Sequence, residues 1–395
     1  MQVTLTLLTG PEKGLAFAFS QHDTFLVGRS KNSHFQLPVN DKSFSRLHFM
    51  VEVNPPRCRI VALGSRNGTY VNGQRIIGTD LKDGDQIRAG QTTIGVKVQI
   101  SPSEEAIAIR PELVDTPFMP KIAGYVPLRE LANGCLGRLY LAATTPKDEL
   151  RAIQILRPRE PGTQAHVDQL LEDAGPLLKL RHANIAPLLE LGVGRHHFHC
   201  VYDYLSGADA AEILEREGPL AVDRALAWID PLLAALDFAH GLGLTQRDVK
   251  PSRVRIVEEA GREKPIWCVF GLNRIFAASP LSGLAGLGDL TAQAPYWPPE
   301  LLADFKNPTP AGDQYAAAAL LYFFLTRAHP FDLPTVESRR YSVLLKQQTI
   351  PLRDRRPDIP EEIAAVAQRA LSRQPGQRFA NVGEFRQALL RSRGA

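Results

Sequence analysis

Three short clusters near the start of the chain combine cations, hydroxyls and side-chain amides. They are Gly28-Arg29-Ser30, Ser45-Arg46-Leu47-His48, and Ser65-Arg66-Asn67-Gly68-Thr69-Tyr70-Val71-Asn72-Gly73. A guanidinium presents a planar fork that matches two phosphate oxygens, and a serine hydroxyl adds a further donor. An asparagine amide can bind a peptide backbone through both its donor and its acceptor. The clusters therefore predict the capture of an anion, such as a phosphorylated peptide, on loops carried by a sheet.

Taken singly, each cluster has an ordinary explanation, because Asn-Gly pairs often only form tight turns. In this order they resemble the forkhead-associated (FHA) domain, a phosphothreonine-binding β-sandwich. The resemblance implies that the phosphopeptide is contacted by the polar side chains Arg29, Ser45, Arg46, Arg66 and Asn67. It implies structural roles, in bracing or shaping the loops, for Gly28, His48, Gly68, Thr69, Asn72 and Gly73. The alternative is an FHA fold used for contacts that do not need phosphate.

The rest of the chain, residues 124–395, resembles the protein kinase fold, with bacterial serine/threonine kinases the nearest type. The landmarks occur in the order of that family: a glycine-rich loop over 131–140, Arg151-Ala152-Ile153-Gln154, Arg181-His182-Ala183-Asn184-Ile185, the catalytic loop Gln246-Arg247-Asp248-Val249-Lys250-Pro251-Ser252-Arg253, Val269-Phe270-Gly271 and Pro298-Pro299-Glu300. The resemblance implies two scaffold contacts. Glu300 should pair with Arg378, and Asp313 should brace the backbone of the catalytic loop.

Several positions that carry phosphoryl transfer in this family hold residues without the required chemistry. Gln154 replaces the phosphate-binding lysine, and Asp173 stands in place of the glutamate that pairs with that lysine. Val269 and Arg253 replace the two metal ligands. Mg²⁺ prefers oxygen ligands, which neither an isopropyl group nor a guanidinium supplies. We therefore expect no cofactor, no bound metal and no Mg-ATP binding.

Other parts of the nucleotide site are kept. The glycine-rich loop retains Gly134 and Gly137 but has alanine at its first glycine position, and the catalytic loop retains Asp248 and Lys250. We expect Asp248 to act as a carboxylate that braces the loop. Its alternative role is that of a general base, which an active enzyme would need.

The composition indicates a folded globular protein of two or three domains, with 395 residues, 44% hydrophobic and 22% charged. No apolar run reaches the roughly 18 residues that cross a bilayer. The N-terminus lacks the basic and apolar segments of a signal peptide. The four cysteines are far apart, which suggests neither a disulfide framework nor a zinc site, so we expect a cytoplasmic protein without membrane insertion.

The charge is distributed unevenly. Residues 1–100 hold 12 Lys and Arg against 7 Asp and Glu, whereas the remainder holds 34 against 35. The basic excess agrees with an anionic ligand of the first hundred residues. It is too sparse for a nucleic-acid-binding surface, so no nucleic acid partner is expected.

The elements that must position these residues follow from local patterns. Short β-branched and aromatic segments broken by glycine turns predict an all-β sandwich over residues 1–100. Four prolines predict an extended linker over 101–123, so that the two modules should move independently. An α+β bilobal kinase-like fold should follow, with a β-rich small lobe over 124–205 and a helical large lobe over 206–395. Helical periodicity is found over 164–180, 208–216, 222–242, 313–326, 361–373 and 382–392.

We interpret the chain as a signalling adaptor. Its FHA domain would bind a phosphothreonine-containing protein, for example an active serine/threonine kinase or its substrate, and its pseudokinase domain would act as a scaffold or allosteric binder. The alternative is a divergent serine/threonine protein kinase with weak or unorthodox ATP-dependent phosphotransfer. Two further segments are predicted to be unremarkable in function: His196-His197-Phe198-His199 as solvent-exposed histidines, and Ser279 to Leu290 as a flexible loop rather than a regulatory surface.

Overall fold

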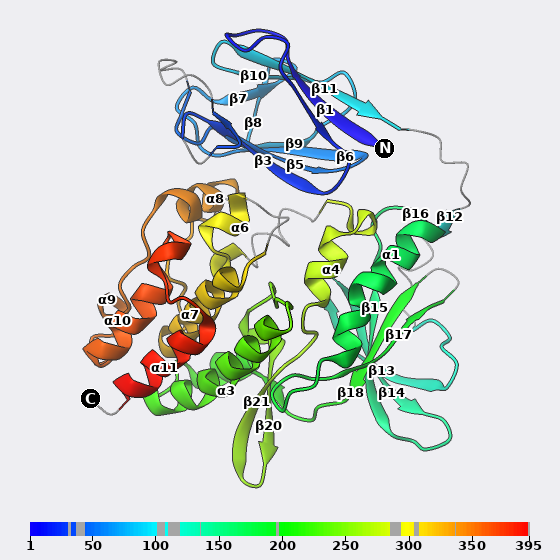
Figure 1. The fold of residues 1–395 in the computed structure, drawn as a ribbon, viewed down its shortest axis with the longest axis vertical. Coiled ribbons are helices and arrows are strands. Elements are labelled where there is room, and N and C mark those ends of the chain that lie inside the picture. The colour runs from blue at the N-terminus through cyan, green and yellow to red at the C-terminus, as the bar shows by residue number, and fades with distance from the viewer. Residues whose placement is uncertain are drawn as a thin grey trace.

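A β-sandwich lies above a two-lobed α+β body in the computed structural model of the chain (Figure 1). The structure describes residues 1–30, 33–36, 44–100, 107–109, 119–134, 136–194, 197–284, 294–303, 308–335 and 337–393. The fold class is therefore the one expected from the sequence, an all-β sandwich followed by an α+β kinase-like fold.

Two sheets form the sandwich. The first has the order β2-β1-β11-β10-β7-β8, with β1 Gln2–Leu7, β2 Ala16–Phe19, β7 Thr69–Val71, β8 Gln74–Ile76, β10 Gln86–Ala89 and β11 Thr92–Gln99. The second has the order β4-β3-β5-β6-β9, with β3 Asp23–Gly28, β4 Phe35–Gln36, β5 Phe49–Asn54, β6 Arg57–Ala62 and β9 Gly78–Asp80. Alternate residues of each strand, such as Val3, Leu5 and Leu7 of β1, fill the apolar core between the sheets.

Strand β5 is buried along its whole length, which a sandwich strand with one solvated face would not be. Val51 and Val53 belong to the sandwich core. Met50, Glu52 and Asn54 point to the opposite side of the sheet, because successive side chains of a strand alternate. That second face is covered by the kinase-like body.

The small lobe is a five-stranded antiparallel sheet with one helix beside it (Figure 1). The sheet order is β13-β14-β15-β18-β17, with β13 Tyr125–Gly134, β14 Gly137–Thr144, β15 Leu150–Leu156, β17 Leu188–Val193 and β18 Phe198–Asp203. Helix α1, Gln164–Ala174, ends in a 3₁₀ turn over Gly175–Lys179. The helical periodicity over 164–180 is thus divided between two kinds of helix, with Pro176 at the start of the second.

The large lobe is mainly helical. Its helices are α2 Ala210–Glu217, α3 Val222–Gly241, α4 Leu272–Ala278, α6 Pro299–Ala303, α7 Pro310–Thr326, α8 Glu337–Lys346, α9 Leu352–Arg355, α10 Glu361–Ala370 and α11 Val382–Ser392, and its small sheet is formed by β19 Ala208–Asp209, β20 Val254–Glu259 and β21 Arg262–Trp267. Helix α7 is apolar on all sides and lies in the centre of the core. Among the described residues, no helix is long and apolar enough to cross a membrane.

The expectation of a purely extended linker is wrong for one short segment. Strand β12, Ile107–Ile109, pairs antiparallel with β16, Gly162–Thr163, just before helix α1. The prolines of the linker stand outside these three residues, so they do not prevent the ladder. Most of the segment over 101–118 lies outside the described residues.

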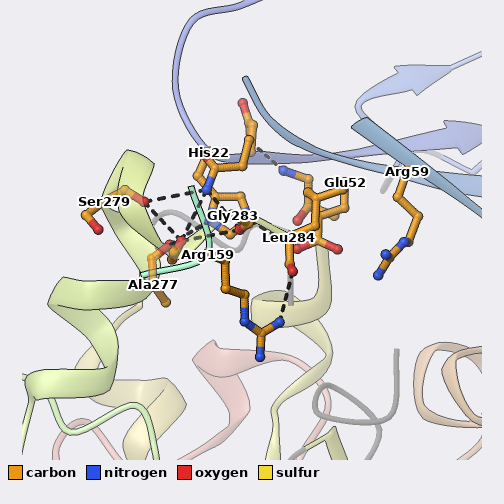
Figure 2. A network of polar contacts seen from close by, with 12 residues as sticks. His22, Glu52, Arg59, Arg159, Ala277, Ser279, Gly283 and Leu284 are labelled. Carbon is orange, nitrogen blue, oxygen red and sulfur yellow. Dashed lines mark hydrogen bonds and ion pairs between the residues drawn. The ribbon is translucent and has the colours of Figure 1, made fainter. Parts of the chain in front are cut away.

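The expectation of two independent modules is also contradicted, because the sandwich packs on the kinase-like body. Leu26, Met50 and Val61 of the sandwich share an apolar cluster with Trp297 and Leu345 of the large lobe. Beside it, a polar network crosses between the modules (Figure 2). These contacts join residues more than 200 positions apart, and no local pattern of the sequence reveals them.

The polar network is centred on His22 and Asn54. The His22 Nδ1 atom lies 2.6 Å from the Ala277 carbonyl oxygen, and Nε2 lies 3.2 Å from Glu52 Oε1. The Asn54 amide donates to the Gly283 carbonyl at 2.9 Å. The first part of the segment predicted as a flexible loop, up to 284, is therefore held against the sandwich, while 285–290 lie outside the described residues.

The prediction that the histidines after β17 are exposed to solvent is also wrong. His197 and His199 are buried, at 8% and 6% exposure, instead of facing solvent, and His196 lies outside the described residues. A Cβ atom at Gly192 or Gly194 would lie 2.3 Å or 2.0 Å from the imidazole carbons of His199 and His197. Gly192 of β17 and Gly194, which directly follows that strand, leave space for the rings, which accounts for their burial.

Candidate functional site

The phosphopeptide-binding candidates lie on loops that leave the ends of two strands. A Cβ atom at Gly28 would lie 2.3 Å from the Arg46 carbonyl oxygen, so only glycine lets the end of β3 approach this loop. Backbone hydrogen bonds from Arg29 to Ser45 (3.1 Å) and from Ser30 to Arg46 (2.8 Å) then hold the first two motifs together.

His48 connects the second motif to the third. Its ring is completely buried, and Nδ1 accepts a hydrogen bond from the Ser45 backbone amide at 3.3 Å. Nε2 faces the Gly68 carbonyl at 3.0 Å, so this nitrogen carries the ring proton. The Ser45 hydroxyl in turn accepts from the Arg66 backbone amide at 3.2 Å. These bonds place the five candidate side chains around one loop cluster.

The third motif is shaped by its turn residues. Asn72 and Gly73 both have positive φ, +50° and +83°, as a two-residue hairpin turn requires. The Asn72 amide donates to Asp85 Oδ1 at 2.8 Å, and its Oδ1 atom accepts from the Gln86 backbone amide at 2.9 Å. Thr69 is fully buried below the turn.

The side chains expected to touch ligand differ in exposure. Arg46, Arg66 and Asn67 are exposed, while Ser45 and Arg29 are half-buried. The Arg29 Nε atom donates to the Phe44 carbonyl at 2.5 Å, which orients the guanidinium from below. Cations and hydroxyls that open to solvent from a braced loop set can bind an oxyanion such as a phosphate.

In the region that corresponds to the nucleotide site of a kinase, the polar side chains already bond to other groups of the protein. Gln154 of β15 is buried, and its amide donates to the carbonyls of Arg138 and Ile155, both at 3.1 Å. Asp173 is exposed on helix α1 and accepts from Gln169 at 2.9 Å. The structure therefore does not bring Gln154 and Asp173 together, and the amide hydrogens of Gln154 are already used.

The position of the expected metal ligand is apolar. Val269 is 6% exposed and lies in a cluster with Leu136 of the glycine-rich loop and with Val167 and Leu170 of helix α1. Its φ is +54°, an unusual conformation for a β-branched residue, which the surrounding packing must maintain. Gly137, with φ +118°, has the carbonyl of Ile155 where a Cβ would stand, at 2.1 Å, and Gly134 ends β13.

Asp248 is clamped by two cations of its own loop. Arg253 Nε lies 2.6 Å from Oδ2, and Lys250 Nζ lies 2.8 Å from Oδ1. Burial alone would raise the pKa of this carboxyl, but Arg253 and Lys250 outweigh it and lower the pKa to about 2. The carboxylate is thus ionised at neutral pH, and its charge is balanced within the loop.

The scaffold contacts are formed. Asp313 accepts from the backbone amides of Gln246 (2.7 Å) and Arg247 (2.8 Å), and it lies 2.9 Å from His240 Nε2. Glu300 and Arg378 make a two-pronged ion pair, with distances of 2.5 and 2.8 Å.

Gln246 has a role that its sequence position did not suggest. It stands where the family has a histidine, and its Oε1 atom accepts from the Gly271 backbone amide at 2.7 Å. This bond ties the catalytic loop to the segment that begins at Val269. An amide acceptor thus connects the two loops without a titrating group.

Comparison with known proteins agrees with this description. Residues 125–390 match the protein kinase domain, and residues 25–90 match the FHA domain. The chain belongs to the protein kinase family. An FHA domain implies the binding of phosphothreonine peptides, and the bilobal body is the protein kinase domain.

Bacterial serine/threonine kinases are among the named proteins to which the chain is similar. Serine/threonine-protein kinase PknD of Mycobacterium tuberculosis is 27% identical over 261 residues, which cover 66% of this chain and 38% of PknD. The probable serine/threonine-protein kinase PknB of Lactococcus lactis is 26% identical over 265 residues, or 66% of this chain and 40% of PknB. The chain spans well under half the length of these relatives.

Two solved structures have a similar fold. The structure of Rad53 1-466 in complex with AMP-PNP has a TM-score of 0.55 at 18% identity and covers 98% of this chain and 100% of that chain. The kinase domain of PknI from Mycobacterium tuberculosis has a TM-score of 0.55 at 24% identity, covering 69% of this chain and 97% of that one. At these identities the similarity shows the fold alone.

Proposed function

We propose that this chain is a phosphothreonine-binding signalling protein of the serine/threonine kinase family, with a kinase domain that serves as a scaffold rather than a Mg²⁺-dependent phosphotransferase. The first part rests on the loop cluster, in which hydrogen bonds join the loops of Arg29, Ser45 and Arg66, and in which Arg66 is exposed to solvent. The partner is a protein that carries phosphothreonine, such as an active serine/threonine kinase or its substrate.

The binding proposal is tested with the full chain and one peptide in phosphorylated and plain forms. We expect only the phosphothreonine form to bind. Arg29→Ala should weaken binding about 100-fold, because a charge-assisted two-pronged contact is lost. Arg29→Lys is the matched control, since it keeps the charge but not the fork and should give an intermediate loss. Equal affinity for the two forms would overturn the proposal.

The scaffold proposal rests on the surroundings of Asp248. The carboxylate that a kinase would use as a base is held between Lys250 and Arg253, and an isopropyl group stands at the metal position. Metal ions supply much of the electrostatic stabilisation of phosphoryl transfer, so their ligands are costly to lose. Any nucleotide that binds would meet cations directly, and Mg²⁺ would compete with them.

A divergent kinase is the second candidate, supported by the family of the chain, by its named relatives and by the ionised state of Asp248. Thermal-shift titrations of ATP in EDTA and in Mg²⁺ separate the two. The scaffold role predicts no stabilisation that depends on Mg²⁺ and no autophosphorylation. Autophosphorylation that disappears in Asp248→Asn would instead establish the divergent kinase.

A further inference from the structure

A groove with a volume of about 850 Å³ lies between the FHA loops and the kinase domain. Ser65 and Arg75 line it from the FHA side, and Ser342 and Lys346 line it from helix α8. A Cβ atom at Gly64 would lie 3.7 Å from the Ser342 hydroxyl, and Lys346 Nζ donates to the Leu63 carbonyl at 2.7 Å. Helix α8 therefore forms a second wall beside the third motif, Ser65 to Gly73. This motif and the loops of Gly28–Ser30 and Ser45–His48 are called the recognition loops below.

Two cations line the groove, Arg75 and Lys346, and two more stand on the neighbouring loops, Arg46 near Lys346 and Arg66 directly after Ser65. Among the described residues, none of the four has a carboxylate within ion-pair distance. The acidic residue that lines the groove, Asp332, is paired with Arg355 at 2.6 Å. Elsewhere in the protein, cations such as Arg224 are paired with glutamates. Within the part of the chain that the structure describes, the positive charge at the groove therefore has no carboxylate partner.

Two further observations concern groups at the groove that have no counter-charge or no hydrogen-bond partner among the described residues. Burial lowers the pKa of Lys346, and the nearby Arg46 guanidinium lowers it further, as expected for a cation without a counter-charge. Ser65 is 8% exposed, and its hydroxyl has no hydrogen-bond partner among the described residues. A buried hydroxyl without a partner is uncommon and costs free energy. An anionic ligand would supply the counter-charge that Lys346, bound only to the Leu63 carbonyl, does not have among the described residues.

The groove lies within reach of a peptide bound at the recognition loops. Ser65 directly precedes Arg66 and Asn67, and an extended peptide advances about 3.3–3.6 Å per residue. A side chain only a few residues from the phosphothreonine can therefore enter the groove. Carboxylates complement the cations at the groove, whereas apolar side chains would bring no charge partner to them.

We propose that the kinase domain completes the phosphopeptide site, and that the groove between Ser65 and helix α8 binds acidic side chains flanking the phosphothreonine. The inference rests on the proposed phosphothreonine binding and adds the class of peptide. The preferred partner carries Asp or Glu within a few residues of its phosphothreonine. The two domains must be docked for this preference to appear.

The test compares phosphothreonine peptides with alanine flanks and with glutamates placed at single positions on either side. The full-length protein should bind the best acidic peptide about 5- to 10-fold more tightly than the alanine peptide, as one or two partly buried ion pairs would provide. Lys346→Gln should remove most of this gain and leave the alanine peptide within about twofold. Lys264→Gln is the matched control, because Lys264 pairs with Glu259 in the distant β20–β21 hairpin (Figure 1).

A second variant is needed because Lys346→Gln also removes a hydrogen bond between the two domains. Ser342→Asp places a negative charge on the α8 wall while Lys346 keeps its bond to Leu63. It should weaken the acidic peptide by about 5-fold or more and spare the alanine peptide. Equal binding of acidic and alanine peptides by the unmodified protein would overturn the inference. So would an equal loss for both peptides in Lys346→Gln, or equally tight binding of the acidic peptide without phosphate.

The failure of the inference differs from the failure of the function on which it rests. If no phosphothreonine peptide binds, the proposed function is wrong. If phosphothreonine peptides bind and Arg29→Ala abolishes binding, but flanking glutamates have no effect, only the acidic groove is wrong.

Discussion

The recognition loops of the FHA domain and the catalytic loop of the kinase domain differ in whether their charged side chains have oppositely charged partners. Around the recognition loops, Arg46 and Arg66 are exposed without a carboxylate partner among the described residues. In the catalytic loop, Asp248 is buried between Lys250 and Arg253. Charges that are left open can bind a ligand, whereas a buried ion pair is costly to break, because the remaining partner is left uncompensated. A charged residue kept in a family motif can therefore bind a ligand only where no neighbouring side chain already compensates its charge.

The contrast predicts that removing an internally paired charge costs stability without affecting peptide binding. The largest effect is expected for Arg378→Ala, which leaves Glu300 without the two hydrogen bonds of a fully buried guanidinium. The free energy of unfolding of the kinase domain should fall by about 3–5 kcal/mol in urea titrations. Arg353→Ala, which removes an exposed pair with Glu361, is the control and should cost less than about 1 kcal/mol. A loss below 1 kcal/mol for both variants would contradict the distinction.

The charge balance of the catalytic loop predicts a dependence of stability on pH. The pKa of Asp248 is lowered to about 2 in the folded protein, from a model-peptide value of 3.8. This group therefore contributes stability that is fully present at about pH 5 and is lost as the pH falls through the two pKa values, towards about 2. The contribution is about 2 kcal/mol, at roughly 1.4 kcal/mol per pKa unit.

Measured unfolding free energies between pH 5 and pH 2 check this dependence. Asp248→Asn should be less stable at pH 5, because Lys250 and Arg253 lose their counter-charge, and its stability should fall less steeply towards pH 2. Identical slopes for the two proteins would show that Asp248 is not clamped as described.

A substitution at the interface can weaken the docking of the FHA domain on the kinase domain without changing the core of either domain. Asn54→Ala removes the hydrogen bonds to the Gly283 carbonyl and the Ser282 hydroxyl, at 2.9 and 3.1 Å. Docking should weaken by about 1–2 kcal/mol, because the acceptors become buried and unpaired. Hydrogen exchange over residues 279–284 should accelerate while the sandwich core stays protected. Thr79→Ala, at a half-buried position of the same sheet, is the control, and an effect of equal size there would count against the interface.

The smallest effect is expected for a single open cation. Arg46→Gln should weaken phosphopeptide binding by about 5-fold, since one exposed ionic contact is lost, and should change stability by less than about 0.5 kcal/mol. Peptide titrations and thermal unfolding measure the two quantities separately. Lys97→Gln on β11 changes the net charge of the domain equally, so a similar loss there would mean that only the overall charge matters.

Much of the site was open to prediction from the order of residue types. The Arg, Ser and Asn motifs predicted the FHA loops, because glycine and asparagine turns have strong local preferences. The replacements at Gln154, Val269 and Arg253 indicated a change of chemistry, because a side chain's capacity to bind metal follows from its composition. The exposure of His197 and His199 was predicted wrongly, since the space beside Gly192 and Gly194 becomes visible only when the strands pair.

The sequence by itself determined the two folds and the identity of the motif residues, through periodicities that act over a few residues. Only the tertiary structure decided which charges are balanced and which face of β5 is covered. The alternation of β5 predicts one buried face, but the burial of Met50 and Asn54 depends on Trp297, Leu345 and Gly283. Lys346 likewise reaches the recognition loops only because helix α8 docks beside Leu63. Electrostatic and apolar contacts depend on distance in space, which a linear pattern does not contain.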